Sequence, residues 1–76
     1  MNEGPLAKLK KRSFSVAGHR TSVALEPEFW IALEKQARAE RLHLVALISR
    51  VDSSRGDRPL ASALRVYALM RAMMQD

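Results

Sequence analysis

The chain has 76 residues, no cysteine and a formal net charge of +5. This length allows one small domain that buries only about 60 % of its unfolded surface, so we expect oligomerisation to add stability. The absence of cysteine excludes disulfides and thiolate chemistry and fits a reducing cytoplasm, where we expect the protein to reside. We expect no signal peptide at Met1, and no apolar run is long enough to span a membrane.

The positive charge is concentrated at the amino-terminal end. Among residues 1–20, five basic side chains stand against one acidic side chain, whereas residues 21–76 hold eight basic and seven acidic ones. An early Gly-Pro pair and the lack of any period predict a flexible basic arm over residues 1–12. The arm ends in three consecutive basic residues: Lys10, Lys11 and Arg12. Such a cluster favours a polyanion as partner, and the alternative is a solvated tail that only aids solubility.

Residues 19–25 alternate as a strand does, with Val23 and Leu25 pointing to one face. The other face carries Arg20, Ser22 and Ala24. Residues 13–16 alternate as well, and Gly18 is either a bend or bulge within one long strand or the turn of a hairpin. A lone strand leaves its backbone polar groups unpaired, so the simplest partner for residues 19–25 is the same strand of a second copy.

Helical periodicity dominates the remainder of the chain and predicts helices over residues 27–40, 43–55 and 60–74. Pro27 suits a first helical position, where its missing N–H costs nothing. Trp30 follows at core spacing, so we expect it to pack rather than to stack on nucleic-acid bases. Gly56 suits the left-handed position just past the second helix. The fold class expected is therefore mostly α with one short β-strand.

The third helix is expected to carry one apolar face, lined by Ala63, Val66, Tyr67, Met70 and Met74. Methionines at its end are more typical of a flexible packing surface than of a site. The domain organisation expected is a flexible arm over residues 1–12, a core over residues 13–56 and a C-terminal helix over residues 57–76.

Several short motifs follow one another in the order and spacing of a known family: Arg20, Ser22 and Leu25, then Ala37-Arg38, Arg41-Leu42-His43 and Ala46-Leu47-Ile48. Over about residues 19–52 the chain resembles the ribbon-helix-helix family of Arc/MetJ/CopG-type DNA-binding proteins. Residues 18–22, with residues 63–66 downstream, are also similar to a subgroup of short bacterial members that carry a C-terminal extension.

The resemblance implies an intertwined homodimer whose two strands pair antiparallel and enter the major groove of double-stranded DNA. Arg20 would bond guanine through its guanidinium fork, Ser22 several base edges, and Ala24 a thymine methyl. Phosphate contacts are expected from five residues: Lys10, Lys11, Arg12, His43 and Leu44. The last two begin a helix, where free N–H groups and the positive dipole end attract anions.

Two residues depart from the family pattern. Arg41 stands where the family prefers Gly, and a left-handed residue with a side chain costs roughly 1–2 kcal/mol. His43 stands where the family prefers a Ser or Thr cap. For Arg20, the alternative to base reading is an ion pair with Glu26 or Glu28 that only supports the strand.

We therefore expect a dimeric, sequence-selective DNA-binding protein that regulates transcription. The alternative is an antitoxin-like or other interaction module that binds a protein partner through the apolar end of its C-terminal helix. An enzyme is not expected, because His19 and His43 are the only imidazoles and no metal-ligand spacing or Gly-rich phosphate loop is present. No cofactor or metal is expected either.

Overall fold

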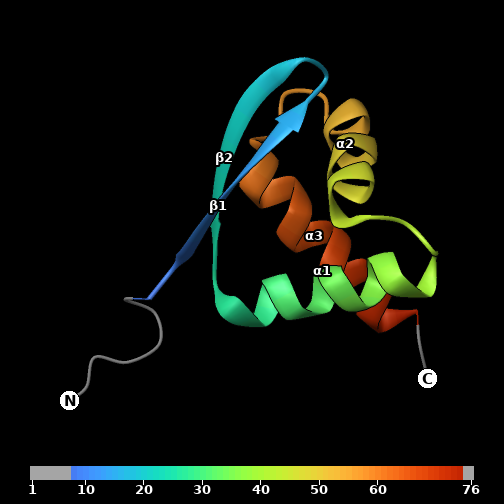
Figure 1. The fold of residues 1–76 in the computed structure, drawn as a ribbon. Coiled ribbons are helices and arrows are strands. Elements are labelled where there is room, and N and C mark those ends of the chain that lie inside the picture. The colour runs from blue at the N-terminus through green and yellow to red at the C-terminus, as the bar shows by residue number, and fades with distance from the viewer. Residues whose placement is uncertain (1–7, 75–76) are drawn as a thin grey trace.

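The structure is a computed structural model that describes residues 8–74 as two strands followed by three helices (Figure 1). The elements are β1 (Lys10–Val16), β2 (His19–Leu25), α1 (Pro27–Ala39), α2 (Leu44–Ser54) and α3 (Leu60–Met73). The helix ends agree with the sequence prediction to within one residue. Part of the arm expected over residues 1–12 is instead strand, since β1 begins at Lys10, and residues 1–7 lie outside the described residues. No helix of the described segment is long and apolar enough to cross a membrane.

The two strands form an antiparallel hairpin within one chain, which corrects the expectation of a single strand. Their register runs from Val16 opposite His19 to Lys10 opposite Leu25. Ala17 and Gly18 connect them with φ angles of 53° and 82°. Left-handed conformations at both turn residues match the right-handed twist of the flanking strands, which is why this turn closes a tight hairpin. Gly18 is thus a hairpin turn, and β2 finds its first partner in its own chain.

The core lies between the inner face of the hairpin and the three helices. Its largest fully buried side chains are Leu25, Leu33, Leu47, Ile48 and Leu64. Helix α3 contacts α1, α2 and β2, and Figure 1 shows it passing behind the hairpin to reach α1. Fully burying one such side chain contributes about 1.5–3 kcal/mol, so a single chain already closes a substantial core. Trp30 is 4 % exposed, which confirms that it packs.

The apolar face predicted for α3 is only partly packed. Ala63 and Tyr67 contact the core, whereas the other three residues of that face are exposed: Val66, Met70 and Met74. Leu64 and Ala68, which lie outside the predicted face, are buried. Because α3 is apolar around most of its circumference, periodicity alone does not identify which side packs on the core.

Glu40 ties the three helices together. Its carboxylate accepts hydrogen bonds from Gln36 on α1, from Arg50 on α2 and, at 2.9 Å, from the Tyr67 hydroxyl on α3. The hydrogen bond from Gln36, followed by those from Arg50 and Tyr67, lowers the pKa of Glu40 from 4.5 to about 2. A second link joins α3 to the start of α1, where Arg65 Nε donates to Glu26 Oε1 at 2.9 Å.

The depressed pKa of Glu40 predicts an acid-sensitive fold. A carboxyl whose pKa is lower in the folded state stabilises the protein above pH 4.5, and this contribution is lost as the pH falls towards about 2. Glu40→Gln should therefore destabilise the protein at pH 7 and flatten the pH dependence of unfolding in that window. Urea denaturation at a series of pH values measures this, with Asp57→Asn in the exposed loop as the control. An unchanged pH profile in Glu40→Gln would contradict the assignment.

The left-handed backbone at Arg41 predicts a stabilising substitution. Arg41 has a φ of 59°, a conformation that costs a residue with a side chain about 1–2 kcal/mol. Arg41→Gly should raise the free energy of unfolding by about 1 kcal/mol after the entropy that glycine adds to the unfolded chain. Arg38→Gly is the matched control, because helical backbone at that position makes glycine destabilising by about 0.5–1 kcal/mol. Equal destabilisation by both substitutions in thermal unfolding would rule out strain at Arg41.

Candidate nucleic-acid interface

The outward face of the hairpin is a continuous polar and basic surface. It carries six side chains, Lys11, Ser13 and Ser15 from β1 and Arg20, Ser22 and Ala24 from β2. Five of them are exposed, and Ala24 is half-buried. The strand alternation that buries Val23 and Leu25 against the helices turns these six side chains the other way. We call these six residues the outward face.

Cross-strand pairs set the layout of the outward face. Ser13 lies opposite Ser22, and their hydroxyl oxygens are 2.8 Å apart in a hydrogen bond. Lys11 lies opposite Ala24 at one end, and Arg20 lies opposite Ser15 at the other. The two positive charges therefore sit on different strands at opposite ends, separated by small side chains. A surface of this kind offers hydrogen-bond donors at both ends and lets a ligand approach closely between them.

Arg20 is available for binding. Its side chain is exposed and forms no hydrogen bond or ion pair among residues 8–74. Of its two candidate ion-pair partners, Glu26 is bound by Arg65 instead, and Glu28 is exposed in the first turn of α1. In this structure Arg20 therefore forms no ion pair that stabilises the strand.

Arg12 has a different place from the one expected for a phosphate contact. It lies on the inner face of β1, where Nη1 donates to Glu34 Oε2 at 2.7 Å. Its guanidinium also lies 4.9 Å from the centre of the Trp30 ring. The same Trp30 donates through Nε1 to the Lys10 carbonyl oxygen at 2.8 Å. Of the three consecutive basic residues, only Lys11 belongs to the outward face.

The start of α2 has the features of an anion site. His43 is the capping residue, and its side chain makes no capping hydrogen bond. Ala46 and Leu47 donate to its carbonyl oxygen, so the N–H groups of Leu44 and Val45 are not used by the helix itself. A cleft of about 320 Å³ adjoins this end and is lined by Glu34, Ala37, Arg38, Leu42, His43 and Leu44. Free N–H groups at a helix start favour a phosphate.

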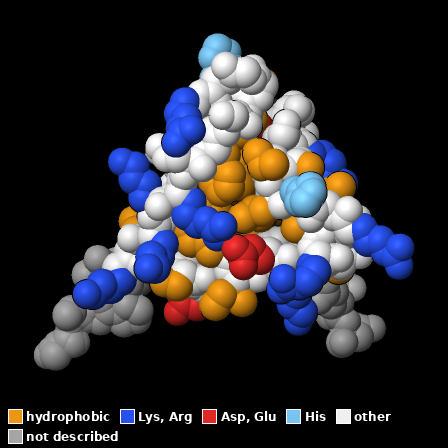
Figure 2. Space-filling model, viewed as in Figure 1, with side chains coloured by type: hydrophobic (Ala, Val, Ile, Leu, Met, Phe, Trp, Pro, Cys, Tyr) orange, Lys and Arg blue, Asp and Glu red, His pale blue; other side chains and the backbone are white. Residues whose placement is uncertain are grey.

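Basic side chains gather along the side of the molecule that the hairpin forms (Figure 2). The same view shows apolar surface in a hollow between the hairpin and the helices. The described residues contain no group of three or more His, Cys, Asp or Glu side chains that could hold a metal ion.

Residues 9–72 match the family model of the ribbon-helix-helix domain. The chain belongs to the ribbon-helix-helix domain family. The match begins before β1 and ends within α3, so this ribbon-helix-helix domain is wider than residues 19–52, on which the sequence resemblance rested. No curated protein and no solved structure matches the chain.

Ser13 and Ser15 are candidate site residues of this ribbon-helix-helix domain that sequence reasoning missed. Their alternation with Phe14 and Val16 was visible, but a face is defined only once the strand has a partner. The signal that would have found them is the pairing across the two-residue turn, which puts Ser15 opposite Arg20 and Ser13 opposite Ser22.

The two neighbours Arg12 and Lys11 should respond differently to substitution. Arg12→Gln removes a half-exposed ion pair and a cation–π contact, so it should lower the free energy of unfolding by about 1 kcal/mol. Lys11→Gln should leave it unchanged, since its side chain is exposed on the outward face. Urea denaturation compares the two, and equal stability of both variants would remove the structural role given to Arg12.

Proposed function

We propose that this ribbon-helix-helix protein is a dimeric, sequence-selective DNA-binding regulator that inserts its outward face into the major groove. The observation that carries the proposal is the outward face itself, which is exposed, basic and polar, and free of carboxylates. Membership of the family and the net charge of +5 support DNA as the partner.

The proposed dimer forms along the free edge of β2. This strand pairs with β1 on one side only, and the described residues supply no strand for its other side. Antiparallel pairing with the β2 strand of a second copy satisfies that edge and gives a four-stranded sheet. The two middle strands are then the intermolecular ribbon that the family resemblance implies. A two-fold axis between them predicts an inverted-repeat DNA site.

The width of such a sheet determines which strands reach the bases and which strands lie over the phosphates. Four strands span about 14 Å at ordinary strand spacing, whereas the major groove is about 12 Å wide. The middle strands therefore reach the base edges, while the outer strands lie over the phosphates. In this arrangement Arg20, Ser22 and Ala24 contact bases, and Lys11 contacts phosphate.

The start of α2 is proposed as a further phosphate contact, through the N–H groups near His43 and Leu44. Its contribution does not depend on base sequence. It fixes the position of the sheet on the duplex, because phosphate contacts set register without reading bases.

Arg20→Ala tests the proposal. Duplexes selected from a random pool by the wild-type protein are compared with random duplex, and the variant should lose about 1–3 kcal/mol per half-site on the selected duplex. It should also relax base choice at one base pair per half-site. Its thermal stability should equal that of the wild type, because the side chain is exposed and unpaired among the described residues.

Arg58→Ala is the matched control, since it removes an exposed arginine from the loop between α2 and α3 rather than from the hairpin. It should keep both the affinity and the base choice of the wild type. A fall in stability of Arg20→Ala with an unchanged ratio of specific to random binding would refute the assignment of the reading face.

A further inference from the structure

The outer side of α3 is an unusually apolar surface for an exposed helix. Val66, Met70 and Met73 recur at spacings of four and three residues and are 39 %, 50 % and 70 % exposed. Leu69, at 56 %, lies beside them on the same side of the helix. None of these residues belongs to the hairpin or to the start of α2. We call these four residues the α3 stripe.

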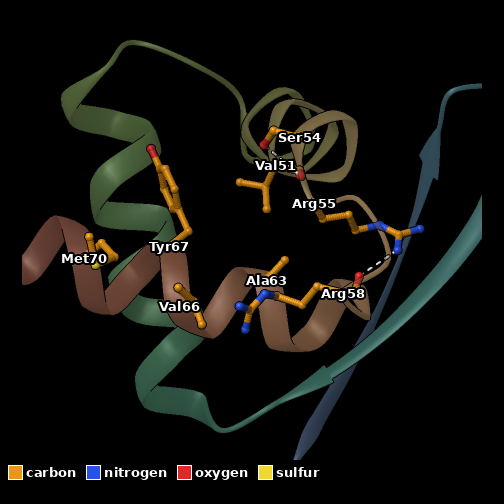
Figure 3. Close-up of a pocket in the computed structure, with 8 residues that line it drawn as sticks. All are labelled: Val51, Ser54, Arg55, Arg58, Ala63, Val66, Tyr67 and Met70. Atoms are coloured by element: carbon orange, nitrogen blue, oxygen red, sulfur yellow. Dashed lines mark hydrogen bonds between the residues drawn. The ribbon is translucent and has the colours of Figure 1, made fainter.

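A groove adjoins the α3 stripe, between the end of α2 and α3 (Figure 3). It has a volume of about 280 Å³ and is lined by Val51, Ser54, Arg55, Arg58, Ala63, Val66, Tyr67 and Met70. Figure 3 shows Met70 and Tyr67 towards one end and the two arginines towards the other. The groove thus has an apolar floor and a basic end.

The basic end keeps hydrogen-bonding capacity for a ligand. Arg55 donates through Nε to Asp52 and through Nη1 to the Arg58 carbonyl oxygen. Arg58 donates through Nη1 to the Ser62 hydroxyl at 3.3 Å. A guanidinium carries five N–H donors, so both retain donors beyond these bonds. No carboxylate lines the groove, which makes an acidic group the complementary partner at this end.

A second copy of the chain is a poor occupant, because its described residues offer few free carboxylates. Six acidic residues lie within residues 8–74, and four of them already form ion pairs: Glu26, Glu34, Glu40 and Asp52. Only Glu28 and Asp57 are left, and the α3 stripe itself carries no acidic residue. Charge complementarity therefore favours a different protein.

We propose that the groove and the α3 stripe bind an amphipathic helix of another protein, one with an acidic flank. Its apolar face packs on Val66, Met70 and Met73, since flexible methionine side chains adapt to such a face. Its carboxylates pair with Arg55 and Arg58 at the basic end. The groove shares no residue with the outward face, so this binding does not rest on the proposed DNA-binding function.

Synthetic helical peptides test the proposal with the full chain. One peptide carries leucines at i, i+3, i+4 and i+7 with glutamates on the flank, a second has lysines in place of the glutamates, and a third has serines in place of the leucines. By fluorescence anisotropy the glutamate peptide should bind at least about tenfold more tightly than either of the others. Equal binding of the glutamate and lysine peptides would overturn the proposal.

Two variants of the groove sharpen the test. Arg58→Glu should reverse the preference between glutamate and lysine peptides, and Met70→Ser should weaken both, while circular dichroism verifies that each variant is folded. Arg20→Ala is the matched control and should bind the glutamate peptide as the wild type does. An unchanged peptide preference in Arg58→Glu would refute the proposal that the basic end of the groove pairs with carboxylates of the bound helix. Loss of self-association in Met70→Ser by sedimentation would show that a second copy, not another protein, covers this surface.

Discussion

Pairing of β1 with β2 across the Ala17-Gly18 turn is the interaction on which the rest of the structure depends. It gives one short segment two faces with opposite chemistry. The inner face supplies Val16, Val23 and Leu25 to the core, and the outward face is left basic and polar. Because the side-chain period of a strand is two, any one-residue slip in this pairing would bury the polar side and expose the apolar one.

The helices hold the hairpin in place rather than forming a separate layer. Trp30 on α1 bonds the backbone of β1 and lies under the guanidinium of Arg12. Arg65 on α3 bonds Glu26, the residue that links β2 to α1. The third helix is consequently part of the folded unit and not an appendage, in agreement with a family match that reaches residue 72. The outer side of α3 stays exposed in the folded chain.

Much of the fold could be predicted from local chemistry. Pro27 marked the start of α1, Gly56 adopts the left-handed conformation expected past α2, and Arg41 occupies the strained position that its place in the motif implied. Other features depend on contacts distant in sequence. From the sequence alone Arg12 is a solvated cation, because no local pattern predicts its contacts with Glu34 and Trp30. Likewise, the inner side of an almost wholly apolar α3 is chosen by its neighbours, which is why Met70 faces outward.

Backbone amide resonances, recorded while a selected duplex is titrated into isotopically labelled protein, test most directly whether the hairpin contacts DNA. We expect the largest shifts at Lys11, Ser13, Arg20 and Ser22, with smaller ones at the start of α2 and none along the outer side of α3. Shifts concentrated on α3 with an unperturbed hairpin would contradict the assignment of the outward face as the DNA-binding surface.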